Sequence, residues 1–187
     1  QVWYESLGAD PLDAPPQARL SGTPAPILRP HASHKGSYGD LAIIGGAPSM
    51  TGAALLAASA ALHHGAGRVF VGLLDGGSMG VDPLQPELMF RSPESLDPAQ
   101  LTVVSGCGGG SAIAAQLPRL LSTAPRLVLD ADALNAIASD SQLATLLRAR
   151  AARQRQTVLT PHPLEAARLL GSTTAEVQHE RLATAQQ

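Results

Sequence analysis

The sequence predicts an α/β domain with three layers, αβα, around a mostly parallel sheet. Short apolar runs alternate with longer helix-type stretches along the chain, as in the succession of 41–44, 51–64 and 69–74. This order of strand, helix and strand is typical of the βαβ crossover, which joins parallel strands. Several apolar runs end in glycine, aspartate or a proline pair, as strand ends near binding loops do in open α/β sheets. The 187 residues suffice for one sizeable domain.

Composition excludes several classes of protein. The net charge is -2 and no basic stripe is present, so we expect no nucleic-acid partner. The single cysteine, Cys107, excludes an internal disulfide and a cysteine-based zinc site, and it fits a reducing, cytoplasmic setting. The helix near residue 55 is too short to cross a membrane, and we expect no signal peptide at the N-terminus.

The first elements lie around the stretch 41–73. Residues 1–29 are rich in proline and are interpreted as a linker or tail, so that the domain begins near residue 30. A strand over 41–44 leads into a helix, for which Thr51 is the expected N-cap and Gly65 the left-handed residue beyond the end. Because this helix has almost no polar face before His63, we expect it to be buried.

The remaining strands are expected at 101–105, 126–129 and 157–159, which makes five strands in all. Helices are expected from Ser111 to about 121, within 133–153, over 164–170, and after Thr173, where Thr173 and Glu176 form a capping box. The segment 86–91, PELMFR, is the ordered part of a loop region. No strand follows the last helix, so we expect a sheet that is incomplete at the C-terminus. Its open apolar edge leaves self-association as an option.

Four strand ends carry residues suited to binding or catalysis: Gly45-Gly46, the glycine run 106–110, the pair Asp130 and Asp132, and Pro161-His162-Pro163. In a parallel sheet these ends share one edge. The glycine run either lets the backbone approach a ligand or simply makes a flexible βα turn. It is not the dinucleotide fingerprint, since Ser111 stands where the third glycine belongs, and it is not a P-loop.

The other candidates each have two interpretations. Asp132 is favoured as a helix N-cap, whereas Asp130 remains open between a structural role and binding Mg²⁺ or a substrate hydroxyl. His162, held between two prolines, is either a structural residue or a donor to an amide or phosphate. Lys35, the only lysine, reaches a phosphate or lies in a solvated turn. Cys107 is not expected to act as a nucleophile, and no protein-borne metal site is expected.

These segments resemble a known family in order and spacing. The strings HKGSYGDLAIIGG, SMTGAALLAASAALHHGAGRV, PELMFR, LVLDADALNAIA and TPHPLEAARLLG are similar to those of the ADP/ATP-dependent NAD(P)H-hydrate dehydratases. The resemblance covers about residues 30–187 and implies the ribokinase-like fold. The proline-rich start resembles the end of the epimerase domain that precedes the dehydratase domain in bifunctional proteins.

The resemblance implies dehydration of the S-epimer of hydrated NADH or NADPH, coupled to hydrolysis of ADP or ATP with Mg²⁺. It implies substrate contacts at three positions: Ala53 through its amide, Gly108 through close backbone approach, and His162 through its ring. Two positions depart from the family pattern, because Cys107 replaces a proline and Leu164 replaces a glycine.

The resemblance also implies a nucleotide site that this sequence lacks. The family's Lys-Gly strand end and Gly-x-Gly-Asp helix start are absent, and 36–40, GSYGD, has the wrong spacing. The catalytic aspartate is therefore expected beyond Gln187, with this chain carrying mainly the substrate-binding half. Two alternatives stay open: a small-molecule kinase of the same fold class that phosphorylates a hydroxymethyl group, and a non-catalytic nucleotide-binding module.

Overall fold

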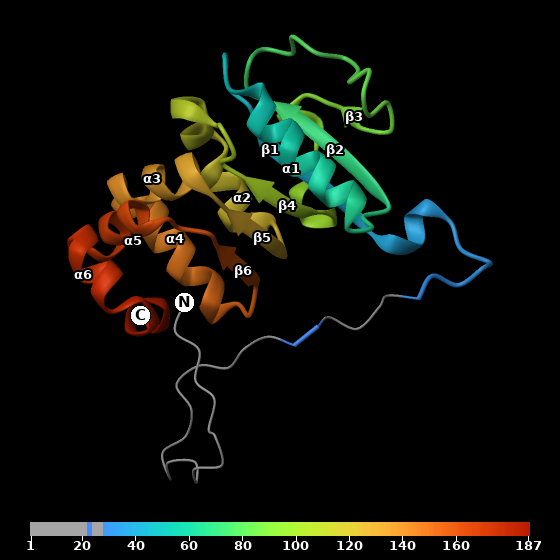
Figure 1. Ribbon diagram of the computed structural model, residues 1–187. Helices are drawn as coiled ribbons and strands as arrows, with labels where there is room; N and C mark the ends of the chain where they lie inside the picture. Colours follow the sequence, from blue (N-terminus) through green and yellow to red (C-terminus); the bar gives the residue numbers. More distant parts are fainter. Residues whose placement is uncertain (1–21, 24–27) are drawn as a thin grey trace, which may run out of the picture.

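The computed structural model describes residues 22–23 and 28–187, and the proposed linker, residues 1–29, lies mostly outside this part of the chain. Six strands form one sheet in the order β3-β2-β1-β4-β5-β6, and every neighbouring pair is parallel. Helices cover both faces of this sheet (Figure 1). The prediction of a three-layer α/β domain with a mostly parallel sheet is thus confirmed.

The first βαβ unit forms where the sequence predicts it. It consists of β1 (Asp40–Gly45), α1 (Thr51–His63) and β2 (Arg68–Leu73). Gly65 has φ +98, and the amides of Gly65 and Ala66 donate to the carbonyl oxygens of Leu62 and Ala61. These two bonds make a Schellman C-cap, so the left-handed role of Gly65 is confirmed.

Two details of α1 differ from the prediction. Met50 rather than Thr51 occupies the N-cap position, and no side chain caps the first turn. The helix is also not fully buried, because only Ala54 and Ala58 are buried along it and Leu56 is 75% exposed. One face of an outer-layer helix meets the sheet, and its alanine content allows close approach there without covering the opposite face.

The segment PELMFR contains a sixth strand that the sequence analysis missed. This strand, β3 (Met89–Phe90), pairs with β2 at the end of the sheet. Two residues are too few to show strand periodicity, and the pairing depends on tertiary contacts. Two 3₁₀ turns follow, η2 (Pro93–Ser95) and η3 (Pro98–Gln100).

The second half repeats the alternation of strands and helices. Its elements are β4 (Thr102–Ser105), η4 (Gly110–Ala115), α2 (Leu117–Thr123), β5 (Arg126–Leu129), α3 (Ala131–Ser139), α4 (Ser141–Ala152), β6 (Gln156–Leu159), α5 (Pro163–Leu170), α6 (Thr174–His179) and α7 (Arg181–Gln186). The helix expected from Ser111 is a 3₁₀ turn followed by a short α-helix, because Pro118 starts a new first turn. The capping box of Thr173 and Glu176 is confirmed.

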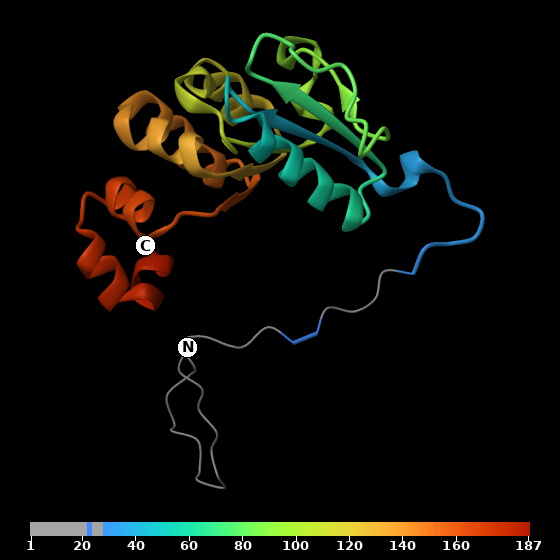
Figure 2. The same ribbon diagram turned by 45° about the horizontal axis from the view of Figure 1, so that its top comes forward.

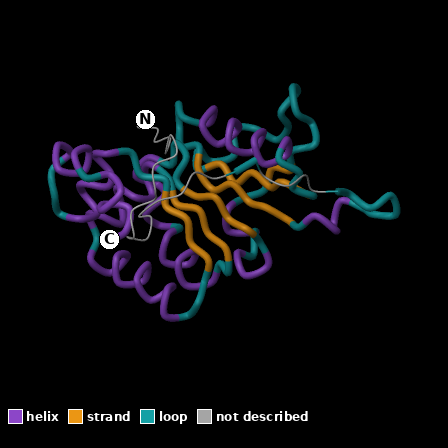
Figure 3. The backbone as a smooth tube through the Cα atoms, turned by 60° about the horizontal axis from the view of Figure 1, so that its bottom comes forward, coloured by secondary structure: helices purple, strands orange, loops and turns teal. Residues whose placement is uncertain are grey.

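The hydrophobic core has two parts, one on each face of the sheet. In β1, Ile43 packs with α1 on one face, whereas Ala42 and Ile44 pack with the layer of α2, α3 and α4 on the other. Strand β1 is central, since Ile43 pairs with both Val71 and Val104. Figure 3 shows the strands between the two helical layers.

The helices α5, α6 and α7 lie together beyond the last strand, to one side of the sheet (Figure 2). Strand β6 is the last strand of this sheet, and its Val158 and Leu159 are 54% and 39% exposed. An exposed apolar edge strand is a surface on which another strand can pair. Self-association through this edge stays a prediction.

Arg150, near the end of α4, joins the C-terminal end of α2 to the start of β6. Its guanidinium is buried and donates to the carbonyl oxygens of Leu121 and Ala124 at 3.0 and 2.8 Å, which are among the last carbonyls of α2. It also bonds Thr157 and the Gln156 carbonyl at the start of β6. A buried cation with neutral partners satisfies helix-end carbonyls that would otherwise lack donors. Burial accordingly lowers the pKa of Arg150, as does the charge of Arg155.

Candidate functional site

The carboxyl edge of the sheet brings together the loops that follow β1, β4, β5 and β6. The β1 and β4 loops join through their backbones: the Gly46 amide donates to the Cys107 carbonyl oxygen at 3.0 Å, and the Ala47 amide to the Gly108 carbonyl oxygen at 2.7 Å. A Cβ on Gly45 would lie 2.4 Å from the Cys107 carbonyl oxygen, so this contact requires glycine. The two glycine loops therefore form one tightly packed unit.

Gly108 lies directly against the start of α1. Its φ is +58, and a Cβ there would meet the Met50 carbonyl oxygen at 2.6 Å and the Ala53 Cβ at 3.0 Å. The predicted substrate contacts Gly108 and Ala53 are thus neighbours in space. The Ala53 amide donates to the Met50 carbonyl oxygen at 3.2 Å, so in this structure it closes the first turn of α1.

Asp130 links three strand ends. Its carboxylate accepts a hydrogen bond from the Thr160 hydroxyl at 2.7 Å, and it accepts the Cys107 thiol at 3.4 Å. Cys107 follows β4 and Thr160 follows β6, so the aspartate after β5 connects the Gly108 loop with the His162 loop. This network gives Asp130, left open by the sequence, a structural role between its neighbours.

The prediction that Asp132 caps α3 is wrong. Asp130 occupies the N-cap position, and Asp132 lies in the first turn, where its carboxylate accepts the Gly110 amide at 2.8 Å. Between them Ala131 has φ +42, a left-handed conformation that is uncommon for a residue with a Cβ. The helix starts two residues earlier than the sequence suggests, at Ala131 rather than Ala133. Strained backbone of this kind clusters at functional sites.

His162 is the N-cap of α5. Its Nδ1 accepts the Leu164 amide at 3.1 Å, its own amide donates to Glu165 at 3.0 Å, and its Nε2 lies 3.3 Å from Glu165 Oε1. Because Nδ1 accepts a hydrogen bond, the proton of the neutral ring sits on Nε2. The side chain is 60% exposed, whereas that of Glu165 is 6% exposed. The histidine is therefore held in place by its own helix and is open to a ligand.

The Cys107 thiol is unsuited to nucleophilic catalysis. Burial, together with the charge of Asp130, raises the pKa of this thiol to about 12. The nucleophilic form is the thiolate, which is scarce near neutral pH when the pKa is so high. The structure agrees with the prediction that Cys107 is not a nucleophile.

Lys35 lies away from these loops. It belongs to η1 (Lys35–Tyr38), which precedes β1 and therefore lies at the amino edge of the sheet. His63 and His64 are near the same edge, where their Nδ1 atoms bond the carbonyl oxygens of Ser59 and Ala60 at 2.8 and 2.9 Å. Both rings therefore bond carbonyl oxygens in the last turn of α1.

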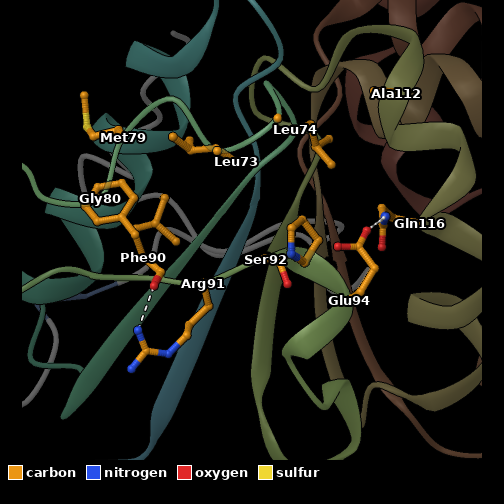
Figure 4. A pocket seen from close by; sticks show the side chains of 14 residues that line it. Leu73, Leu74, Met79, Gly80, Phe90, Arg91, Ser92, Glu94, Ala112 and Gln116 are labelled. Carbon is orange, nitrogen blue, oxygen red and sulfur yellow. Dashed lines mark hydrogen bonds between the residues drawn. The ribbon is translucent and has the colours of Figure 1, made fainter.

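A cavity of about 510 Å³ opens at the carboxyl ends of β2 and β3. Figure 4 shows Leu73, Met79 and Phe90 on one side of it and Glu94 with Gln116 on the other. None of the three predicted contact residues lines this cavity, so the sequence analysis missed it. The available signal was the cluster Gly76, Gly77 and Gly80 shortly before an aromatic strand end.

Among the described residues, no group of three or more histidine, cysteine, aspartate or glutamate side chains is arranged to hold a metal ion. Within the same residues no helix has the length and apolarity needed to span a membrane.

Comparison with known proteins identifies the relatives of the chain. A family model described as NAD(P)H-hydrate dehydratase matches residues 41–187. The ADP-dependent (S)-NAD(P)H-hydrate dehydratase of Neisseria meningitidis serogroup B is 42% identical over 162 residues, which cover 83% of this chain and 53% of the relative. The bifunctional NAD(P)H-hydrate repair enzyme Nnr of Escherichia coli is 34% identical over 198 residues, which cover 97% of this chain and 36% of the relative.

Solved structures agree with these sequence matches. The ADP/ATP-dependent NAD(P)H-hydrate dehydratase from Bacillus subtilis, co-crystallized with ATP/Mg²⁺, superposes with a TM-score of 0.60 at 27% identity, covering 82% of this chain and 55% of the other. A protein from Streptococcus mutans superposes with a TM-score of 0.65 at 26% identity, covering 83% of this chain and 57% of the other. This chain therefore spans about half the length, or less, of the relatives it matches.

Proposed function

Because this chain belongs to the NAD(P)H-hydrate dehydratase family, we propose that it binds hydrated NADH or NADPH and takes part in its dehydration at the expense of ADP or ATP. The single observation that carries the proposal is the convergence of Ala53, Gly108 and His162 on one edge of the sheet. The resemblance implied these three positions, and they come from loops far apart in the chain. We place the protein in the cytoplasm, in accord with its free thiol.

We propose that each of the three positions contributes differently to binding. The exposed His162 ring would turn its Nε2–H from Glu165 Oε1, 3.3 Å away, to an amide or phosphate oxygen of the substrate, while Nδ1 stays bonded to the helix start. Gly108 lets the loop after β4 pack closely against the start of α1, because the Cβ of a larger residue would push the loop and the helix apart. Ala53 presents the small first turn of α1, on which a ligand can lie without meeting a long side chain.

The proposed reaction needs a nucleotide and Mg²⁺, and the residues described here do not form a site for the ion. The carboxylate of Asp130 already accepts two side-chain hydrogen bonds, and that of Asp132 accepts a backbone amide. Magnesium takes six oxygen ligands in octahedral geometry, of which a protein commonly supplies one or two free carboxylates and water and phosphates supply the rest. We therefore assign to this chain the recognition of the hydrated dinucleotide.

Calorimetric titration of the chain with (6S)-NADPH hydrate tests this proposal. We expect binding by the wild-type chain and weaker binding by His162→Ala, with His179→Ala, an exposed histidine on α6, as the matched control. The proposal fails if the folded wild-type chain does not bind the hydrate, or if His162→Ala and His179→Ala bind it equally well. Phosphorylation of a hydroxymethyl compound with ATP would favour the kinase alternative instead.

A further inference from the structure

We propose that a second cavity, at the amino edge of the sheet, binds the phosphate groups of a small soluble ligand. This cavity of about 980 Å³ lies at the edge opposite to the three expected substrate contacts. The end of α1, the segment before β1 and the first residues of β4 and β5 line it. Its basic side chains, apart from the paired arginine described below, are Arg29, His63, His64 and Arg126.

The register of the sheet turns Arg126 toward the face that α1 covers. Arg126 pairs with Thr102, and Thr102 pairs with Leu41, so these three side chains leave the same face of the sheet. Leu41 packs with the core cluster around α1, which identifies this face. The Arg126 Nε donates to the Thr102 hydroxyl at 2.9 Å, and the guanidinium therefore leans across β4 toward β1. Its two terminal NH₂ groups have no hydrogen-bond partner among the described residues and remain available to an anion.

The end of α1 presents donors in place of bare carbonyl oxygens. The Nδ1 atoms of His63 and His64 bond carbonyl oxygens in the last turn of the helix. Because a carbonyl oxygen only accepts, Nδ1 carries a proton in both rings, and both Nε2 atoms are left for a ligand. Arg29 donates to the Gly65 carbonyl oxygen at 2.8 Å, and its guanidinium lies 4.2 Å from the centre of the Tyr38 ring. Carbonyl oxygens that would repel an anion are thus covered by donors.

The charges around the cavity favour an anion. Asp40 is the one carboxylate among the described residues that line it, and this carboxylate is already paired with the Arg68 guanidinium through two hydrogen bonds. The positive charges of Arg29 and Arg126 are therefore not balanced by a carboxylate within the cavity. The chain as a whole has a net charge of -2, so the sign of this cavity is opposite to that of the molecule.

Phosphate groups suit this set of donors better than a single carboxylate does. The planar guanidinium group binds two phosphate oxygens through parallel hydrogen bonds. Strands β1 and β5 stand two strand spacings apart, which is roughly 10 Å. A ligand with two phosphate groups can therefore bridge the arginine at the start of β5 and the donors at the end of α1.

The two imidazole rings make binding depend on pH. Since Nδ1 already carries a proton, each ring donates from Nε2 only after it takes up a second proton and becomes a cation. Histidine ordinarily does so below about pH 6.5. The charged groups that line the cavity beside the rings are the two unbalanced arginines and the paired Asp40. A bound dianion favours the doubly protonated rings, so the affinity for an anion should rise as the pH falls.

Calorimetry with inorganic pyrophosphate and with sulfate, at pH 6 and at pH 8, tests the site. Sulfate keeps the same charge over this range, so a change in its affinity reports on the protein alone. The variants are Arg126→Gln and His63→Gln. Arg148→Gln and His179→Gln are the matched controls, because both replace exposed side chains that do not line the cavity.

We expect Arg126→Gln to lose about tenfold in affinity for pyrophosphate at pH 6, as the loss of a charge-assisted hydrogen bond predicts. His63→Gln should reduce the rise in sulfate affinity between pH 8 and pH 6, whereas both control variants should match the wild-type chain. No pyrophosphate binding at pH 6, or equal affinities of Arg126→Gln and Arg148→Gln, would overturn the site. A sulfate affinity that does not change with pH, or that changes equally in His63→Gln and His179→Gln, would overturn the role of the imidazoles.

The same variants separate this proposal from the proposed function. At pH 8 all four should bind the hydrated dinucleotide as the wild-type chain does, because the expected substrate contacts lie at the other edge of the sheet. Loss of dinucleotide binding in Arg126→Gln but not in Arg148→Gln would overturn the separation of the two sites.

Discussion

Replacing Gly108 by alanine tests how tightly the β4 loop packs on the start of α1. The change adds one methyl group at a residue with φ +58, where the new Cβ would lie 2.6 Å from the Met50 carbonyl oxygen and 3.0 Å from the Ala53 Cβ. Contacts below 3.0 Å with backbone atoms are not tolerated, so either the loop or the helix start must move. Gly171→Ala is the matched control, because Gly171 has φ +65 and open space around its Cβ position.

The magnitude follows from two contributions. The left-handed conformation costs a residue with a Cβ about 1–2 kcal/mol, and this cost is the same in both variants. Inserting a methyl group into a closely packed contact adds about 1–3 kcal/mol, and only Gly108→Ala incurs this second cost. We therefore expect Gly108→Ala to lose about 2–5 kcal/mol of unfolding free energy, against about 1–2 kcal/mol for Gly171→Ala.

Urea and thermal unfolding of the two variants provide the assay. For a chain of this size each kcal/mol shifts the Tm by about 2–4 °C, so the difference between the variants should amount to several degrees. Equal destabilisation of the two variants would refute the reasoning, because it would mean that the Gly108 loop is free to move away from α1. In that case the loop would not hold a fixed position for a ligand.

Three further predictions concern residues around the same framework. Ser105→Ala should leave the unfolding free energy unchanged or raise it by about 1 kcal/mol, because the Ser105 hydroxyl is buried without a hydrogen-bond partner in the described structure. A clear loss of stability in urea unfolding would contradict this. Arg150→Met should lose about 3 kcal/mol of unfolding free energy, because it leaves buried carbonyl oxygens without donors. Replacement of the exposed Arg148 on the same helix, Arg148→Met, should change stability little. Similar urea midpoints for the two variants would count against the capping role of Arg150. The high pKa of Cys107, about 12, predicts slow alkylation of the folded chain near pH 8, fast alkylation in urea, and faster alkylation of folded Asp130→Asn, since the carboxylate contributes to that pKa. Because the unfolded thiol loses its proton first, this residue should also lower stability as the pH rises from about 8.5 toward 12, and a thiol equally reactive in both states would exclude this.

The sequence predicts the elements well where local signals are strong. The βαβ unit at 41–73, the left-handed Gly65 and the capping box at Thr173 all depend on residues close together in the chain. The strand at Met89 was missed because two residues carry no periodicity and pair only through tertiary contacts. Thr51 was misplaced as an N-cap because the loop before α1 turns one residue earlier, at Met50.

The candidate site shows the same division. Parallel strands place their loops at one edge, so the order of strands and helices predicted that the glycine run 106–110 and the start of α1 share that edge. The resemblance, not the strand order, singled out Gly108 and Ala53, which the structure places against each other. The role of Asp130 did not follow, because its partners Cys107 and Thr160 are 23 and 30 residues away and are chosen by the packing of neighbouring loops. The cavity beside Phe90 was likewise invisible, since its walls come from four separate segments.

The central claim is that the carboxyl edge of this sheet binds a hydrated nicotinamide dinucleotide. Titration of the nitrogen-labelled chain with (6S)-NADPH hydrate, followed by amide chemical shifts, tests it most directly. We expect the shifted amides to belong to the loops around Ala53, Gly108 and His162, with the amino edge near Lys35 unchanged. Shifts confined to the amino edge, or none at saturating ligand, would contradict it.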